Sequence, residues 1–416
     1  MNRSERSLVA CLTLAEAVVL AFIAVTCIKP PGGHYDFNLR MNEAACVARG
    51  VNPYDVWHGD VVLKPYVPNF GVARSALEGK DGFTEDVNAY VPWVYTCMMP
   101  LAVLPREVAW ALYSLLMLAS IMLIFRFSLP RAVGWRAPGG FSQIAAIPLA
   151  MVSYLLWSNA SVGNLIVFVL AASVLMARTL EDESRWILAG AMWAIAMVKP
   201  QSAILFAVPL LMRGRWKVCM VAGALCLLAS VPPAVMCRSS LFDMLIQGPA
   251  ANAGLFNGCG TWPKFLCGRL FGGSADIGIG LAIGAALCVW MTWLLRRERD
   301  WLVYLMPAAI CASCWTYTQA YSHAMGWFVA YAVVGSLVEH PRSKFLWTLS
   351  VVSVPVLSRA FLAWHGFCAF FGMSFPMSEY AFRSIDSLNS TASLAVAVAY
   401  CVWKHLNSPK PLKAPS

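Results

Sequence analysis

The chain alternates long apolar stretches with shorter polar connections, and the length of these stretches predicts membrane-spanning helices. The segments 186–199 and 201–212 are short and meet at Lys199-Pro200, which predicts a tight helical pair. The pattern predicts an all-α bundle of about 12 transmembrane helices. We place them at roughly residues 8–28, 107–126, 142–157, 163–178, 186–199, 201–212, 217–236, 277–295, 301–318, 322–338, 345–361 and 388–404.

Four further segments do not fit a simple span. Residues 92–104 are apolar but short and rich in proline, which favours a re-entrant or interfacial helix. The connections 29–106, 237–276 and 362–387 are long and rich in aromatic residues, proline and glycine. Because this composition differs from that of disordered segments, we expect short helices on the outer membrane face. Residues 1–416 would then form a single membrane-embedded domain.

The basic residues predict the orientation of the bundle. If the N-terminus lies inside, every inner connection carries Lys or Arg, whereas the short outer turns 158–162 and 319–321 carry none. The positive-inside rule therefore predicts cytoplasmic termini and an outer position for the three long connections. The inner basic residues are Arg126, Arg131, Arg136, Arg178, Arg185, Arg213, Arg215, Lys217, Arg296, Arg297, Arg299, Arg342, Lys344, Lys404, Lys410 and Lys413.

Composition excludes several classes of protein. The chain is 59% hydrophobic and 12% charged, which is outside the range of soluble domains, and its net charge of +10 is dispersed. We therefore expect membrane lipids as surroundings and no nucleic-acid partner. Sequence motifs for nucleotides, nucleophilic serine and zinc are missing, and no DxD lies on the outer side, so no cofactor and no metal are expected. Cys237, Cys259 and Cys267 share one connection and form either one disulfide or free thiols.

Asp36 and Lys199 stand out as candidates for chemistry. Asp36 follows the first predicted span, where one-sided desolvation can raise the basicity of a carboxylate and suit it to act as a general base. The alternative is an N-cap of a helix that starts near Phe37. Lys199 lies between two apolar segments, where a buried cation requires an anion such as phosphate. The alternative is a lysine whose ammonium extends to the membrane interface.

Three more basic side chains are predicted on the outer side. His323 starts an outward-facing helix end, and Lys264 and Arg269 could reach the phosphate of a lipid headgroup. Interfacial residues of these types are also common in any membrane protein, so a purely structural role is the alternative.

The order of several short motifs resembles the C-type membrane glycosyltransferases and, more narrowly, glycosyltransferase family 87. The resemblance covers about residues 10 to 335. It rests on an aspartate after the first span, a GVNPYD segment, a tyrosine- and proline-containing stretch, an Ala-Gly to lysine element and a basic R-x-R-W. These correspond to Asp36, Gly50–Asp55, Tyr90–Pro105, Ala189–Lys199 and Arg213–Trp216.

The chain departs from the family pattern at three places. The usual double proline is Pro92-Trp93, and the Gly-Gln-x-Asn turn corresponds to Ala160-Ser161-Val162-Gly163. The late Ser-Pro-x-x-x-x-His element survives only as Tyr317 to His323. The first two departures are close to the predicted pocket and bear on the identity of the donor and the acceptor.

The resemblance implies a polyprenyl-phosphate-dependent hexosyltransferase of a bacterial plasma membrane, with its active site on the outer face. A sugar, mannose by family default, would pass with inversion from the lipid phosphate to a hydroxyl of a glycolipid or glycan acceptor. Asp36 would be the catalytic base, and Lys199, His323, Arg269 and Lys264 would bind the donor phosphate. The substrate-binding residues implied are Asn52, Tyr54, Asp55, Tyr90 and Tyr321.

Two other classes of function remain as alternatives. A transporter or flippase of a lipid-linked or polar substrate would explain the many spans, and it predicts inverted repeats that the sequence does not show. The other alternative is a non-catalytic membrane scaffold, or a family member that has lost activity, which the departures from the family pattern would explain.

Overall fold

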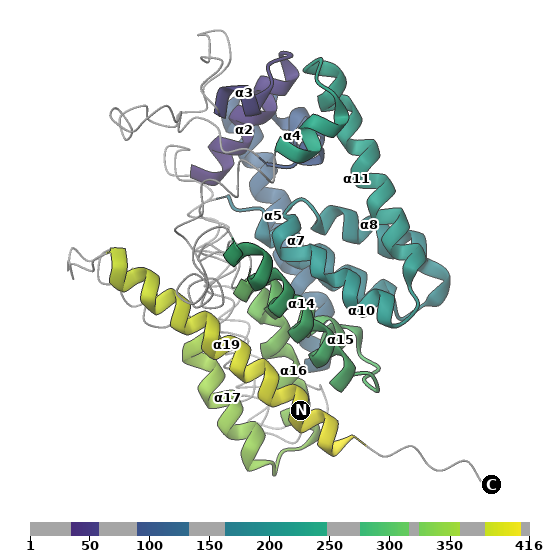
Figure 1. The fold of residues 1–416 in the computed structure, drawn as a ribbon, viewed down its shortest axis with the longest axis vertical. Helices are drawn as coiled ribbons and strands as arrows, with labels where there is room; N and C mark the ends of the chain where they lie inside the picture. Colours follow the sequence, from purple (N-terminus) through teal and green to yellow (C-terminus); the bar gives the residue numbers. More distant parts are fainter. Residues whose placement is uncertain are drawn as a thin grey trace, which may run out of the picture.

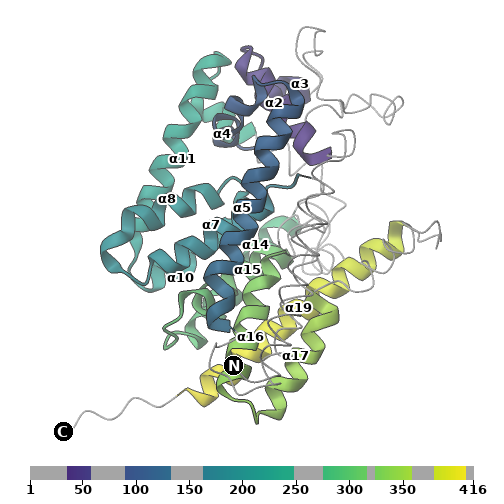
Figure 2. The same ribbon diagram turned by 180° about the vertical axis from the view of Figure 1, so that it is seen from behind.

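The computed structural model describes residues 35–57, 90–132, 163–247, 275–315, 324–357 and 379–408, and within these ranges it contains helices and no strand. Figures 1 and 2 show a bundle in which α2, α3 and α4 gather at the end that the C-terminus of α11 also reaches. The helices are α2 (Tyr35–Ala48), α3 (Pro53–Trp57), α4 (Pro92–Ala102), α5 (Arg106–Ala132), α7 (Ile166–Thr179), α8 (Trp186–Ala196), α9 (Pro200–Ala203), α10 (Ala207–Met212), α11 (Trp216–Met236), α14 (Ala275–Leu294), α15 (Trp301–Trp315), α16 (Trp327–Glu339), α17 (Lys344–Leu357) and α19 (Glu379–Asn407), with the 3-10 turns η3 (Glu183–Arg185) and η4 (Ile204–Phe206).

Two described helices are long and apolar enough to cross a bilayer, Arg106–Ser128 of α5 and Trp216–Met236 of α11. Their outward faces carry large exposed apolar side chains, such as Leu228 (66% exposed) and Val235 (70% exposed) of α11. Such faces are suited to contact with lipid. The predicted spans 8–28 and 142–157 lie outside the described residues, so the number of twelve spans stays a prediction.

The predicted break at Lys199-Pro200 is present. Proline disfavours the helical conformation of the residue before it, and Lys199 accordingly has φ −128° and ψ 78°, with Pro200 in the first turn of α9. The Trp193 indole donates across the break to the Ala203 carbonyl at 3.0 Å. The ammonium of Lys217, at the start of α11, lies 5.8 Å from the ring of Trp186, at the start of α8, so after α10 the chain has returned to the end of the bundle where α8 begins.

Prolines in α11 also help to dock α4. Pro233 has no N–H, so the Ala229 carbonyl of α11 lacks its usual partner four residues on. The hydroxyl of Thr96 in α4 donates to that carbonyl. Because an unsatisfied carbonyl is costly in an apolar environment, this bond fixes the segment 92–104 against α11.

Two predictions about the long connections need refinement. The helix α2 forms inside the connection 29–106, but all its residues from Phe37 to Val47 are buried, so it is an internal helix and not one lying on a surface. Its polar residues are tolerated there because they pair with one another and with neighbouring elements. The helix α19 starts at Glu379, earlier than the predicted 388, and includes part of the connection 362–387.

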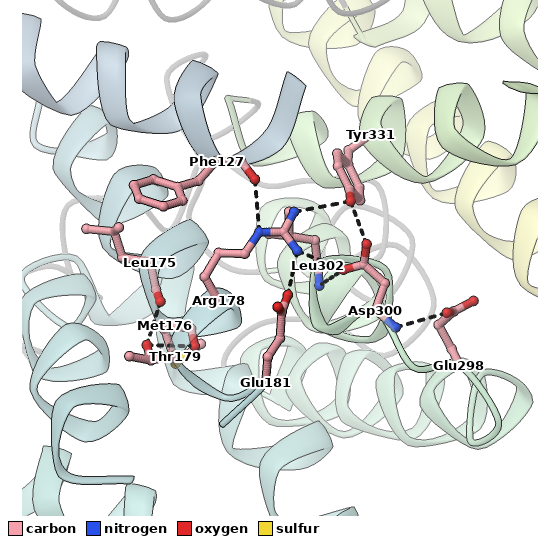
Figure 3. A network of polar contacts seen from close by, with 10 residues as sticks. All are labelled: Phe127, Leu175, Met176, Arg178, Thr179, Glu181, Glu298, Asp300, Leu302 and Tyr331. Carbon is pink, nitrogen blue, oxygen red and sulfur yellow. Dashed lines mark hydrogen bonds and ion pairs between the residues drawn. The ribbon is translucent and has the colours of Figure 1, made fainter. Parts of the chain in front are cut away.

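The end of the bundle away from α2 holds a polar network (Figure 3), which we call the Arg178 network: Arg178, Glu181, Asp300 and Tyr331. The Arg178 guanidinium donates to the Glu181 carboxylate at 2.7 Å and to the Tyr331 hydroxyl at 3.2 Å. Asp300 lies 3.6 Å from Arg178 and accepts a hydrogen bond from Tyr331. Arg178 also donates to the Phe127 carbonyl at 2.9 Å, which ties α7 to α5. The network therefore joins α5, α7, α15 and α16.

The predicted inner basic connections converge at this same end. Lys404 lies 3.1 Å from Glu298 and 3.9 Å from Glu339, and Arg213 donates to the Glu298 carbonyl. Arg215 pairs with Glu183 at 2.5 Å. These contacts link residues far apart in sequence, so one end of the bundle collects the basic connections.

Candidate active site

Asp36 stands in the first turn of α2 and is partly exposed, whereas the residues that follow it in this helix are buried. Positions Asp36, Arg40 and Glu43 follow the spacing i, i+4 and i+7, which places them on one face of the helix. That face meets the turn before α7 and the turn between α8 and α9. The capping alternative placed Asp36 just before a helix that starts near Phe37, whereas α2 starts at Tyr35 and includes Asp36. The Asp36 carboxylate has a tertiary partner.

The partner of Asp36 is Asn164, which bridges it to Lys199. The Asn164 amide donates to Oδ2 of Asp36 at 2.7 Å, and the Lys199 ammonium donates to Oδ1 of Asn164 at 3.3 Å. The backbone N–H of Ile166 donates to the same Oδ1 at 3.0 Å, which fixes the orientation of the amide. Asn164 is 4% exposed, so this bridge is shielded from water.

Gly163 allows the turn before α7 to approach α2 closely. It has φ +75°, and a Cβ at this position would lie 2.6 Å from the Phe37 Cβ, where no side chain fits. Its carbonyl accepts a hydrogen bond of 2.8 Å from the Tyr113 hydroxyl. Phe37 packs against Trp110 and Tyr113, with ring centroids 4.9 and 5.0 Å apart. This glycine therefore positions Asn164 beneath Asp36.

Lys199 is 4% exposed and lies at the break between α8 and α9. The charged groups that act on its ammonium are the Asp36 carboxylate, which stabilises it, and the Arg40 guanidinium, which opposes it. The helix α8 has 11 residues and rises about 16 Å at 1.5 Å per residue before the chain reaches Lys199. The break thus places a buried cation at the N-terminal end of α7, whereas Arg178 lies at the C-terminal end of the same helix.

Arg40 and Glu43 complete the polar face of α2. Their side chains are 3% and 0% exposed and pair at 2.6 Å. The Arg40 guanidinium also lies over the Tyr90 ring, 3.9 Å from its centroid. Burial raises the pKa of Tyr90 to about 12, with Arg40 acting in the opposite direction, so its hydroxyl is protonated at neutral pH.

The site balances two cations against two carboxylates. We call Asp36, Arg40, Glu43, Asn164 and Lys199 the Asp36 cluster. Buried charges are costly unless they are paired or hydrogen-bonded: Arg40 and Glu43 form a direct ion pair, whereas Asp36 and Lys199 each form a hydrogen bond with the neutral amide of Asn164. Within the described residues no group of three or more His, Cys, Asp or Glu side chains could hold a metal ion.

The departure from the family pattern at Pro92-Trp93 has a structural consequence. The Trp93 indole donates to the Met197 carbonyl at 2.8 Å, two residues before Lys199. The tryptophan that replaces the second proline therefore anchors α4 to the turn that carries Lys199. The other motif element, Ala189-Gly190, serves packing, because a Cβ at Gly190 would lie 2.6 Å from the Val221 Cβ of α11.

The GVNPYD segment supports the site from one side. Asn52 accepts from the Tyr54 N–H at 3.1 Å and donates to Asp55 at 3.1 Å, so it caps α3. Tyr54 is fully buried, and its hydroxyl donates to the Tyr90 carbonyl. The Tyr95 hydroxyl also contacts the backbone of Tyr90 at 2.9 Å. These contacts hold Tyr90 where its ring meets Arg40.

The structure brings together only part of the predicted site. Asp36, Lys199 and Tyr90 meet in one cluster, with Asn52, Tyr54 and Asp55 behind Tyr90. His323, Tyr321, Lys264 and Arg269 lie outside the described residues. Cys237 carries a free thiol, and its predicted neighbours Cys259 and Cys267 are likewise outside.

Sequence reasoning missed Arg40, Glu43 and Asn164. The spacing of Asp36, Arg40 and Glu43 would have indicated a shared helical face once α2 was recognised. Asn164 directly follows Ala160-Ser161-Val162-Gly163, the residues that correspond to the Gly-Gln-x-Asn turn of the family pattern. If that motif is aligned one residue later, it covers residues 161–164 and its asparagine falls on Asn164.

The helical bundle combines two helices that are long and apolar enough to cross a bilayer with a buried acid–lysine cluster that is a candidate catalytic centre. The sequence profile described as "Glycosyltransferase family 87" matches residues 88–314, more than half of the chain, and the chain therefore belongs to this family. It is accordingly a transferase that uses a sugar donor and an acceptor. Neither the comparison with curated proteins nor that with solved structures gave a significant match. The matched range includes Tyr90, Asn164 and Lys199 but not Asp36.

Proposed function

We propose that this protein transfers a hexose, mannose in the first instance, from a polyprenyl-phosphate donor to a hydroxyl of a lipid-linked or glycan acceptor. The Asp36 cluster would be the catalytic centre, on the outer face of a bacterial plasma membrane. Family membership supports the reaction class, and the positive-inside pattern supports the orientation.

The observation that carries the proposal is the Asn164 bridge between Asp36 and Lys199. A transfer from a lipid phosphate needs a proton acceptor for the attacking hydroxyl and a positive charge for the leaving phosphate. The bridge holds both groups near each other without a direct ion pair. Within the described residues Asp36 accepts one hydrogen bond, from Asn164, which leaves acceptor positions on a partly exposed carboxylate.

The reaction proceeds as a single displacement. The acceptor hydroxyl oxygen forms a bond to the anomeric carbon, and its proton passes to the Asp36 carboxylate. The bond between the anomeric carbon and the phosphate oxygen breaks, and the polyprenyl phosphate leaves with the electron pair. Attack opposite the leaving group inverts the anomeric centre. The sugar–phosphate bond is already activated, so no nucleotide takes part.

Lys199 stabilises the charge that develops on the leaving phosphate, and Arg40 adds a second cation to the same region. His323, Arg269 and Lys264 are proposed to complete the phosphate site. Asp55, Tyr90 and Tyr321 are proposed as sugar or acceptor contacts, while Asn52 and Tyr54 would act through the position of Tyr90. Asn164 is a positioning residue, because it touches both reacting side chains.

The direct test is sugar transfer by purified protein in lipid nanodiscs, with short-chain polyprenyl-phosphate-mannose as donor and a glycolipid extract as acceptor. Asp36→Asn keeps the size and one acceptor oxygen of the side chain but removes its basicity. We expect release of polyprenyl phosphate to fall by about 10²–10⁴-fold, the usual contribution of a general base. Asp182→Asn is the matched control, because Asp182 is an exposed residue beside η3 at the far end.

The outcomes separate the parts of the proposal. Loss of transfer in Asp36→Asn alone supports both the reaction and the base. Equal transfer in both variants removes Asp36 from the centre. If the folded wild type releases no polyprenyl phosphate from mannose, glucose or arabinose donors, the proposed donor class is wrong.

A further inference from the structure

A cavity of about 430 Å³ lies at the end of the bundle that also carries the Arg178 network. It forms where the connection between α7 and α8 meets the α10–α11 and α14–α15 connections. Its lining combines three arginines, two glutamates and two apolar residues: Arg213, Arg215, Arg299, Glu181, Glu183, Leu180 and Trp301. It is remote from the Asp36 cluster, because the 14-residue helix α7, about 21 Å long at 1.5 Å per residue, separates Asn164 from Leu180 of the lining.

The arginines of the cavity are held in place by aromatic rings and backbone. The Arg213 guanidinium lies 3.6 Å from the centroid of Tyr304 and 4.6 Å from that of Trp301, and it donates to the Glu298 carbonyl. The Arg215 guanidinium lies 5.9 Å from the Trp301 ring. Such stacking orients the planar donors without neutralising their charge.

The carboxylates do not cancel this positive charge. Glu181 is already engaged by Arg178, which is not part of the lining. Glu183 pairs with Arg215, but its side chain is 81% exposed, so the pair is solvated and easily exchanged. The Arg299 side chain makes no ion pair or hydrogen bond within the described residues. The cavity therefore offers guanidinium donors that an anion can use.

We propose that this cavity binds a phosphate group. Guanidinium groups match the oxygens of phosphate in a two-point geometry, and pockets of basic residues at the cytoplasmic side of membrane proteins bind anionic headgroups. The buried Trp301 side chain forms an apolar wall of the cavity. The phosphate would belong either to an anionic phospholipid or to a soluble phosphate. This site is independent of the proposed transfer reaction and of the residues assigned to it.

The test measures binding to the purified full-length protein in neutral detergent micelles by native mass spectrometry and by the shift in thermal unfolding. One arm adds phosphatidylglycerol, a second adds inorganic phosphate, and a third adds phosphatidylcholine. Arg299→Gln removes one donor from the cavity. Arg342→Gln is the matched control, because Arg342 is an exposed arginine of the α16–α17 connection and is not part of the lining.

We expect saturable binding of phosphatidylglycerol or of phosphate to the wild type and to Arg342→Gln, and about tenfold weaker binding to Arg299→Gln, the usual value of one charge-assisted hydrogen bond. Binding in the first arm alone identifies a lipid headgroup, and binding in the second alone identifies a soluble phosphate. Equal binding by Arg299→Gln and wild type, or no saturable binding in either of these arms, would overturn the proposal. Sugar transfer should be unchanged in Arg299→Gln, so the result is separate from the test of Asp36.

Discussion

The Asp36 cluster and the Arg178 network use the same residue types in different ways. In the network, Arg178 contacts Glu181 directly and Asp300 lies 3.6 Å away, with Tyr331 between them. In the cluster, a neutral amide separates Asp36 from Lys199. Direct ion pairs use the hydrogen-bonding capacity of the charged groups and join helices. The amide bridge keeps a carboxylate and an ammonium close while each retains capacity for further hydrogen bonds. The comparison teaches that the proposed mechanism depends on hydrogen-bonding capacity that Asp36 and Lys199 keep for substrates, whereas the partners of Arg178 use its donors for structure.

The largest effect on the cluster is expected from Lys199→Met, which removes the cation while keeping a long side chain. We expect the rate of sugar transfer to fall by about 10²–10³-fold, because the leaving phosphate loses its main electrostatic stabilisation. The measurement is single-turnover release of polyprenyl phosphate in nanodiscs.

Lys404→Met is the control for Lys199→Met, because it removes a lysine that pairs with Glu298 at the other end. It should leave transfer per folded molecule unchanged, since the Lys404–Glu298 pair, 22% and 12% exposed, is far from the Asp36 cluster. A comparable loss of transfer in both lysine variants would break the distinction between the two regions.

The second expected effect concerns Gly163→Ala, which changes the approach of the Asn164 turn to α2. The substitution puts a side chain on a residue with left-handed backbone angles, and the new Cβ would lie 2.6 Å from the Cβ of Phe37. We expect the free energy of unfolding to fall by about 2–4 kcal/mol. The rate of sugar transfer should also fall, because Asp36 adjoins Phe37. Thermal unfolding and transfer assays report the two changes.

Gly214→Ala is the control that separates backbone strain from steric clash. Gly214 has φ +69°, but a Cβ there meets nothing within 4 Å. Only the backbone cost of about 1–2 kcal/mol should remain, with transfer unchanged in the folded protein. If Gly163→Ala and Gly214→Ala behave alike, close approach at Phe37 does not matter to the site.

The smallest of these effects is expected from Arg178→Met in the network. The change leaves Glu181 and Asp300 without their shared arginine, and both are partly exposed, so we expect a loss of about 1–3 kcal/mol in stability. Transfer per folded molecule should be retained. The measurements are thermal unfolding in detergent and transfer at a temperature below the transition.

Arg185→Met is the control for the network variant. Arg185 pairs with Asp182, and both side chains are largely exposed (62% and 47%), so this change should cost at most about 1 kcal/mol. A fall in transfer without a fall in stability in Arg178→Met would show that the network participates in catalysis.

The sequence by itself determined the class of protein and its family. Long apolar segments predict helices, because within a membrane no water is present to hydrogen-bond the backbone N–H and C=O groups. The break at Lys199-Pro200 follows from the steric restriction that proline places on the residue before it. Asp36 and Lys199 were also recognisable, because a charged residue beside apolar segments needs an explanation.

Only the tertiary structure decided which charges meet. The Asn164 bridge between Asp36 and Lys199 depends on the close approach of Gly163 to α2. The contact of Trp93 with the turn that carries Lys199 depends on the docking of α4 by Thr96. Local patterns cannot encode these contacts, because each joins residues separated by tens of positions along the chain. The roles of Arg40 and Glu43 became visible for the same reason, since a polar helix is stable inside the bundle only when distant elements supply its partners.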